Sequence, residues 1–154
     1  MMRSVTHDFD VAAPIEAVFP LFDAQHEAEW APGWQYTPRE PQPFRTTRNA
    51  VFEVPNNAVV HGPQPQDPEL WVVLEFDAAS RRAEYLAVRG REFVRRVTVT
   101  CTPHEGNTRV SVRYDLTALN ADGRAQLAHF SESYLASWEQ PVRDAARRRL
   151  EKTS

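Results

Sequence analysis

The sequence predicts an α+β fold in which an antiparallel β-sheet packs against a long C-terminal helix. Between residues 70 and 119, four segments rich in β-branched and aromatic residues are joined by short turns, which is typical of consecutive antiparallel strands. After residue 120, apolar residues recur every three or four positions, which is typical of an amphipathic helix. The length of 154 residues predicts one domain over residues 1–154.

Composition argues against several classes of protein. Hydrophobic residues make up 42% of the chain and charged residues 25%, which is typical of a folded globular protein. A net charge of −3 does not favour nucleic acid as a partner, and a mean hydropathy of −0.56 argues against membrane insertion. The first residues lack the apolar run of a signal peptide and Cys101 is the only cysteine, so we expect a cytoplasmic protein without an internal disulfide.

The N-terminal part predicts one strand and two short helices. From Val5 to Val11, apolar or aromatic residues alternate with polar ones, as in a half-buried strand. Pro14 suits the first turn of a helix, and the apolar residues after it recur at helical spacing until Pro20 interrupts them. A second short helix is expected from Ala24 to Trp30.

The middle of the chain is rich in proline. Eight of the twelve prolines fall between Pro32 and Pro68. Because proline lacks a backbone donor and biases the preceding residue toward extended geometry, this region predicts long connections and only short edge strands. The strand register between Trp34 and Leu70 stays open at this point.

The second half predicts four strands followed by one long helix. The strands are expected over residues 70–76, 82–88, 92–102 and 108–119. The helical pattern then runs from residue 121 to about 151, with Asn120 or Asp122 as its N-cap. Pro141 removes one helical hydrogen bond and is expected to kink this helix near Ser137.

Four segments, in this order and spacing, resemble the START-like, Bet v 1-like helix-grip superfamily (SRPBCC), also called the polyketide cyclase and lipid transport superfamily. They are residues 9–19 (FDVAAPIEAVF), 30–34 (WAPGW), 71–77 (WVVLEFD) and 106–110 (GNTRV). The resemblance covers nearly the whole chain. It implies a helix-grip fold, in which a curved antiparallel sheet wraps around a long C-terminal helix and two short helices follow the first strand.

The resemblance also implies an internal cavity between the sheet and the C-terminal helix. We expect this cavity to bind a hydrophobic or aromatic small molecule that is lipid-like or polyketide-like, without a cofactor. Whether the chain also catalyses a reaction stays open, and the alternative is an enzyme of the polyketide cyclase, aromatase or dehydratase type. A further alternative is a partner-binding domain similar to the chaperone activators of the superfamily. The third function requires an exposed apolar patch, expected around Trp30, Trp34 and Trp71.

Two polar residues fall on strand faces that the alternation predicts to be buried. His7 shares its face with Phe9 and Val11, so it is either a hydrogen-bonded core histidine or an acid or base of the cavity. Arg95 lies between Phe93 and Val97, where a cation is costly without a counter-ion. It is expected to reach solvent, to pair with Glu75 or Glu53, or to bind an oxygen atom of the ligand.

Aromatic residues supply the other candidate ligand contacts. Tyr114 and Tyr85 are expected to face inward from the sheet, and one stripe of the C-terminal helix carries three aromatic residues that serve as core or as cavity wall. Three more, Trp34, Phe52 and Trp71, lie in the proline-rich region or directly after it. The complete set of predicted ligand-binding residues is His7, Trp34, Phe52, Trp71, Tyr85, Arg95, Tyr114, Phe130, Tyr134 and Trp138.

The sequence lacks the motifs of several common catalytic and metal sites. It contains no glycine-rich phosphate loop, no nucleophile elbow and no paired-histidine zinc motif. His26, Glu27 and Glu29 are close together but lack the spacing of a metal site, so no metal is expected. The choice between monomer and homodimer stays open.

Overall fold

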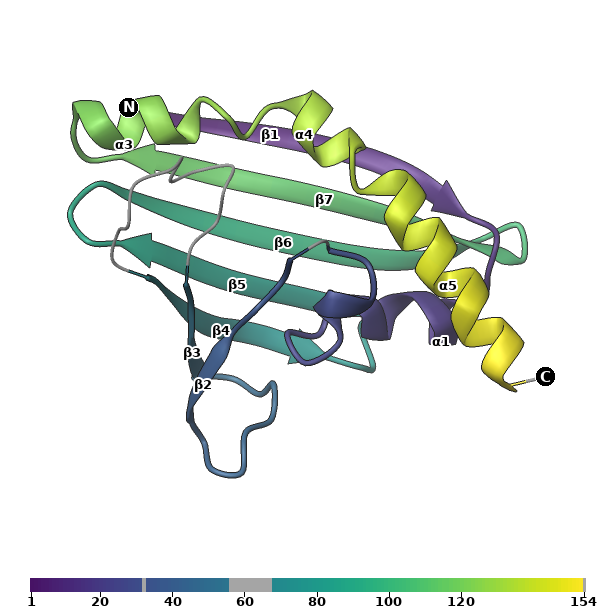
Figure 1. The fold of residues 1–154 in the computed structure, drawn as a ribbon. Coiled ribbons are helices and arrows are strands. Elements are labelled where there is room, and N and C mark those ends of the chain that lie inside the picture. Colours follow the sequence, from purple (N-terminus) through teal and green to yellow (C-terminus); the bar gives the residue numbers. More distant parts are fainter. Residues whose placement is uncertain (32, 56–67, 154) are drawn as a thin grey trace.

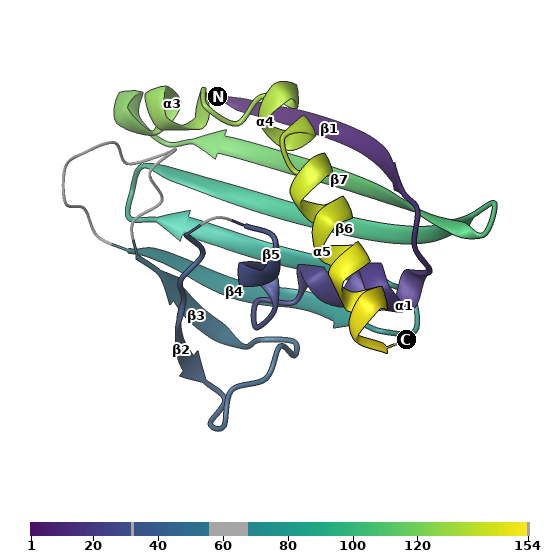
Figure 2. The ribbon, with the colours of Figure 1, turned by 45° about the vertical axis from the view of Figure 1, so that its right-hand side comes forward.

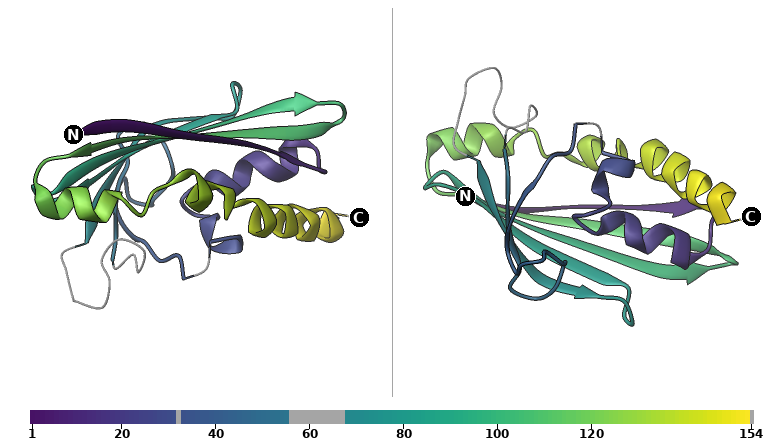
Figure 3. Two further views of the ribbon diagram at one scale, coloured as in Figure 1. Left: turned by 90° about the horizontal axis from the view of Figure 1, so that it is seen from above. Right: turned by 60° about the horizontal axis from the view of Figure 1, so that its bottom comes forward.

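The seven strands form one antiparallel sheet, and the helices cover one of its faces (Figures 1 and 3). The computed structural model describes residues 1–31, 33–55 and 68–153. The order across the sheet is β1-β7-β6-β5-β4-β3-β2, so β1 and β2 form its two edges. The strands are β1 (Met2–Val11), β2 (Thr37–Glu40), β3 (Val51–Val54), β4 (Glu69–Asp77), β5 (Arg82–Arg89), β6 (Phe93–His104) and β7 (Asn107–Ala118).

The helices of the described residues follow the first and the last strand. After β1 come α1 (Ile15–Val18) and the 3₁₀ turns η1 (Phe19–Phe22) and η2 (Glu27–Glu29). After β7 come α3 (Ala121–Leu127), α4 (Glu132–Ala136) and α5 (Glu139–Thr153), and α5 crosses the sheet in Figure 2. The predicted helix-grip α+β fold is therefore confirmed. Among the described residues, no helix has both the length and the apolar character that spanning a membrane requires.

The expectation of one helix from residue 121 to about 151 is wrong, because two breaks divide it. Asn120 caps α3 by accepting a hydrogen bond from Gly123 N at 2.8 Å, and Ser131 caps α4 through Tyr134 N at 3.3 Å. The kink expected near Ser137 is instead a second break, after which α5 begins. Pro141 then lies in the first turn of α5, where its missing N–H costs no helical hydrogen bond.

The second N-terminal helix is also shorter than expected. The segment predicted from residue 24 to 30 contains only the 3₁₀ turn η2. Its two flanking tryptophans are held by backbone carbonyls, since Trp30 Nε1 donates to Leu21 O at 2.7 Å and Trp34 Nε1 donates to Ala24 O at 3.0 Å. These long-range anchors fix the loop around η2 without a regular helix, and a helix of this length has little stability of its own.

Gly123 allows α3 to approach the sheet closely. A Cβ atom at this position would lie 1.8 Å from the carbonyl oxygen of Glu92, so only glycine fits without movement of the backbone. The same Glu92 oxygen accepts a hydrogen bond from Leu119 N at 2.8 Å. The residue that precedes β6 therefore anchors the start of the C-terminal segment, which then runs back over the sheet.

Two rows of side chains on the helix-covered face position the site. Cross-strand pairing aligns Tyr85 of β5, Val97 of β6 and Tyr114 of β7 in one row. The next row contains Trp71 of β4, Ala87 of β5 and Arg95 of β6. Because side chains two residues apart share a face, both rows point toward the helices, as the alternation in β5, β6 and β7 predicts.

Candidate functional site

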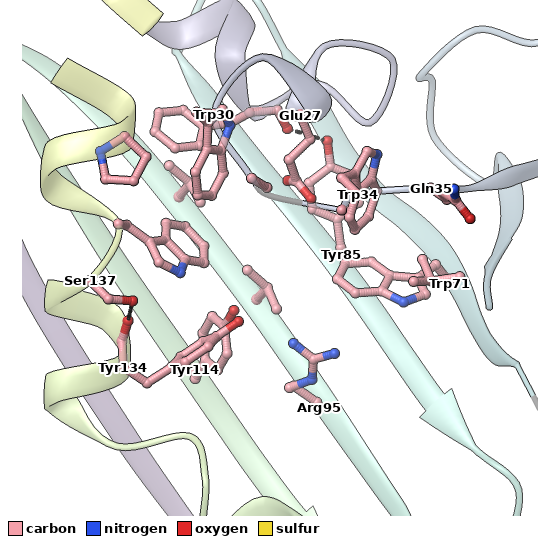
Figure 4. A pocket seen from close by; sticks show the side chains of 18 of the residues that line it. Glu27, Trp30, Trp34, Gln35, Trp71, Tyr85, Arg95, Tyr114, Tyr134 and Ser137 are labelled. Atoms are coloured by element: carbon pink, nitrogen blue, oxygen red, sulfur yellow. Dashed lines mark hydrogen bonds between the residues drawn. The ribbon is translucent and has the colours of Figure 1, made fainter. Parts of the chain in front are cut away.

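A pocket with a volume of about 480 Å³ lies between the inner face of the sheet and the covering segments (Figure 4). This volume is within the range of ~300–1,000 Å³ that is usual for small-molecule sites. Strands β4 to β7 supply the floor, η2 and the following loop supply one wall, and the segment from α4 to α5 supplies the other. The lining residues are Phe22, Glu27, Trp30, Ala31, Gly33, Trp34, Gln35, Val54, Pro55, Trp71, Tyr85, Arg95, Val97, Val99, Tyr114, Tyr134, Ser137, Trp138 and Pro141.

Seven of the ten residues predicted from the sequence line this pocket. Each comes from a different strand, helix or loop, and the fold brings them together: Trp34, Trp71, Tyr85, Arg95, Tyr114, Tyr134 and Trp138. The other three, His7, Phe52 and Phe130, are not among its lining residues.

Two of these three residues contact side chains that line the pocket, and the third pairs with a residue of α5. Phe52 is fully buried and stacks on the outer side of Trp71, with ring centroids 5.6 Å apart. Phe130 is fully buried and lies 4.3 Å from the guanidinium carbon of Arg95. His7 faces α5, where its Nε2 lies 2.6 Å from Glu139 Oε1, so it is the hydrogen-bonded histidine of the two alternatives.

Arg95 forms a buried ion pair with Glu69. Its terminal nitrogen Nη2 donates to Glu69 Oε2 at 2.9 Å, and the two residues are 1% and 0% exposed. The expected partners were wrong, because Glu75 and Glu53 each pair with a different arginine. The counter-ion comes instead from the first residue of β4, which the alternation did not place opposite Arg95.

Aromatic rings surround the Arg95 guanidinium. Its central carbon lies 5.1 Å from the ring centroid of Trp71 and 5.4 Å from that of Tyr114. Ala87 separates Trp71 from Arg95 in their row, and its small side chain leaves room for this stacking. Burial alone lowers the pKa of Arg95, but the Glu69 carboxylate outweighs it and holds the pKa above its usual value. The guanidinium that lines the pocket is therefore always charged.

Glu27 is the second charged group of the pocket, and the sequence analysis did not select it. Its side chain points into the pocket from the wall opposite the sheet (Figure 4). Burial raises the pKa of its carboxyl group to about 8; the charge of Asp23 adds to this effect and that of Arg95 opposes it. Glu27 therefore carries a proton over most of the range near neutral pH.

The polar groups closest to Glu27 already have other partners. The indole N–H groups of Trp30 and Trp34 donate to backbone carbonyls, and the hydroxyl of Tyr85 donates to Phe22 O at 2.6 Å. Within the described residues, no hydrogen bond or ion pair joins the Glu27 carboxyl to another side chain. This carboxyl group is thus a polar group of the pocket that a ligand can engage without displacing a contact among the described residues.

The phenols of the pocket stay protonated at neutral pH. Burial raises the pKa of Tyr85 and of Tyr114 well above the usual value, and burial also raises that of Tyr134. Tyr114 and Tyr134 come from β7 and α4, and their rings lie 6.1 Å apart. They present neutral hydroxyl groups and ring surfaces to a ligand.

Of the pocket residues that were not predicted from the sequence, Glu27 had a local sequence signal. Glu27 and Trp30 are three residues apart in the segment predicted to be helical, and this spacing places two residues on one face of a helical turn. Which face points toward the sheet depends on tertiary packing. Ser137 and Gln35 carried no comparable signal. Among the described residues, no group of three or more histidine, cysteine, aspartate or glutamate side chains is arranged to bind a metal ion.

The Arg95 ion pair predicts a strong non-additive effect on stability. Arg95→Met leaves Glu69 buried without a counter-ion, so we expect it to lower the free energy of unfolding by about 3–5 kcal/mol. The double variant Arg95→Met/Glu69→Leu removes both charges and is expected to regain a large part of this loss. Urea unfolding measures both values. A double variant no more stable than the single variant would contradict a buried, mutually dependent pair.

The raised pKa of Glu27 predicts a pH-dependent stability that Glu27→Gln removes. Because the protonated form is favoured in the folded state, its contribution is complete below the unfolded pKa of 4.5 and is lost as the pH rises through about 8. We expect Glu27→Gln to gain stability over the wild type between pH 5 and pH 9, by at most about 1.4 kcal/mol per pH unit.

Glu29→Gln is the matched control in urea unfolding at these two pH values. The hydrogen bond and charge of Arg149 outweigh burial and lower the pKa of Glu29, so this variant is expected to lose stability relative to the wild type at both pH values, because the ionised form stabilises the fold above pH 4.5. If the difference between Glu27→Gln and the wild type is the same at pH 5 and pH 9, the Glu27 carboxyl is not desolvated.

Comparison with solved structures finds the same fold in enzymes and in other proteins. The ZhuI aromatase/cyclase from Streptomyces sp. R1128 has a TM-score of 0.74 and 19% identity, over 97% of this chain and 96% of the other. Norcoclaurine synthase from Thalictrum flavum, in complex with dopamine and hydroxybenzaldehyde, has a TM-score of 0.70 and 13% identity, over 100% and 90%. Ara h 8.0201 has a TM-score of 0.67 and 12% identity, over 95% of each chain.

Comparison with curated proteins finds no match. The model of one protein family, described as polyketide cyclase / dehydrase and lipid transport, matches residues 2–153. This match includes every strand and helix of the structure and every residue that lines the pocket. The chain therefore belongs to the polyketide cyclase/dehydrase and lipid transport family.

Proposed function

We propose that this protein binds an aromatic or polyketide-like small molecule in the pocket between the sheet and the C-terminal helices. The observation that carries the proposal is the wall of the pocket, in which aromatic rings from β4, β5, β7, α4 and the loop after η2 surround one space. Flat aromatic ligands gain both apolar burial and stacking against such rings. The always-charged Arg95 adds a donor for an oxygen atom of the ligand.

A ligand with few charges suits this pocket. Arg95 and Glu69 neutralise each other, and Glu27 is mostly protonated at neutral pH. The tyrosine hydroxyls supply further neutral donors and acceptors at the sheet and at α4. An apolar body with one or two oxygen atoms would therefore satisfy the pocket better than a phosphate or a dicarboxylate.

A second candidate function is an enzyme of the cyclase or dehydratase type. Glu27 favours it, because a carboxyl group with a pKa near 8 can exchange a proton with a substrate near neutral pH. The likeness to the ZhuI aromatase/cyclase is compatible with this candidate but supports the fold alone.

The partner-binding alternative has less support. It requires an exposed aromatic patch, yet Trp30 and Trp71 are only 7% and 6% exposed. Both line the pocket, together with the partly buried Trp34. These three tryptophans are thus placed to meet a small molecule inside the fold rather than a protein on its surface.

Native mass spectrometry of protein purified without detergent, followed by solvent extraction, tests the proposal. We expect a retained aromatic or apolar molecule in the wild type. Val97→Phe fills the pocket between Tyr85 and Tyr114 and should reduce this retention at least tenfold. Thr100→Phe, on the outer face of the same strand, is the control and should retain the molecule.

Circular dichroism establishes that both variants are folded. Equal retention by Val97→Phe and Thr100→Phe would contradict binding in this pocket. Consistent absence of a retained molecule, together with no change in tryptophan fluorescence on titration with aromatic compounds, would also count against it.

A further inference from the structure

At the Glu27 end of the pocket, the carboxyl group has no partner among the described residues, and the N–H groups of the neighbouring tryptophans are already engaged. Figure 4 shows the Glu27 side chain between the rings of Trp30 and Trp34. The N–H groups of both rings are engaged by Leu21 O and Ala24 O, so the rings offer Glu27 only their π surfaces. Neither tryptophan ring therefore supplies a hydrogen-bond donor to this carboxyl group, and a ligand in the pocket can supply one.

We propose that this end of the pocket binds the ammonium group of an aromatic amine, with the Glu27 carboxylate as its counter-ion. This inference rests on the proposed function and names the class of ligand. A carboxylate pairs with a cation more strongly than with a neutral hydroxyl, and indole faces add a cation–π attraction. Because Glu27 is only partly exposed among these rings, the ion pair is stronger there than in bulk water.

The opposite end of the pocket permits a cation at Glu27. Arg95 is the fixed positive charge there, but Glu69 holds it at 2.9 Å and neutralises it. The guanidinium points into the pocket, and its Nε has no hydrogen-bond partner among the described residues. Nε itself is buried, so an oxygen atom at the far end of the ligand meets the part of the guanidinium that lines the pocket. An aromatic ring with an amine at one end and a hydroxyl at the other fits both ends.

Binding of such an amine requires that Glu27 lose its proton. The ammonium group already carries its proton in solution, so one proton passes from Glu27 to the solvent for each amine bound below pH 8. Affinity then follows the ionised fraction of Glu27 and rises about 50-fold from pH 6 to pH 8. The other charged or titratable groups that act on Glu27 are Asp23, Tyr85, Arg95, Tyr114 and Tyr134. The raised pKa values of Arg95 and of the three tyrosines keep all four protonated in this interval.

Titration with tyramine and with 4-ethylphenol, followed by tryptophan fluorescence at pH 6, 7 and 8, tests the proposal. The two probes share ring and hydroxyl, and only tyramine carries the ammonium group. We expect tyramine to bind more tightly as the pH rises and at least tenfold more tightly than 4-ethylphenol at pH 8. Glu27→Gln should abolish the pH dependence and the preference, whereas the control Glu29→Gln should keep both.

Three results would overturn the proposal. The first is 4-ethylphenol binding as tightly as tyramine at pH 8, and the second is tyramine affinity that falls with pH, as expected if protonated Glu27 donates to a neutral ligand. Either result leaves the proposed function intact, because an aromatic molecule still binds. The third is binding of neither probe while native mass spectrometry finds another retained molecule. If the proposed function itself fails, native mass spectrometry finds no retained molecule and neither probe binds.

Discussion

The ion pair between Arg95 and Glu69 determines the electrostatics of the pocket. Arg95 is the fixed cation of the lining, and it faces Glu27 across the same space. Glu69 pairs with Arg95 at 2.9 Å inside a wall of aromatic rings. The charge of Arg95 still lowers the pKa of Glu27, but burial outweighs this attraction and keeps Glu27 protonated near neutral pH. The pocket thus contains both a permanent donor and a proton-exchanging carboxyl group.

Breaks in the C-terminal segment shape the other side of the pocket. A single straight helix would present one narrow stripe to the sheet. Ser131 caps α4, and a second break separates α4 from α5, which begins at Glu139. Tyr134, Ser137 and Trp138 therefore line the pocket from the region where these two helices meet. Trp138 then packs on Trp30, with ring centroids 4.8 Å apart, and links this junction to the loop that carries Glu27. Two distant segments therefore close one space.

Local patterns predicted the sheet and its inward-facing residues because strand alternation has a period of two. That period placed Arg95 and Tyr114 on the inner face, and both line the pocket. It did not identify Glu69 as the counter-ion, since a partner on a different strand depends on sheet order and register. The helical spacing of three or four residues predicted one continuous C-terminal helix, because the apolar residues keep this spacing across the cap at Ser131. Glu27 was missed for a third reason, since the direction of a short loop is set by distant anchors.

Site-specific carbon-13 NMR titration of the Glu27 carboxyl group tests the central claim most directly. The signal is assigned by its absence in Glu27→Gln, and its chemical shift is followed from pH 4 to pH 10 in protein without added ligand. We expect a midpoint at about 8, because the half-buried carboxyl group is desolvated and has no partner among the described residues. A midpoint near the ordinary value of 4.5 would show a solvated or paired carboxylate and would contradict the account.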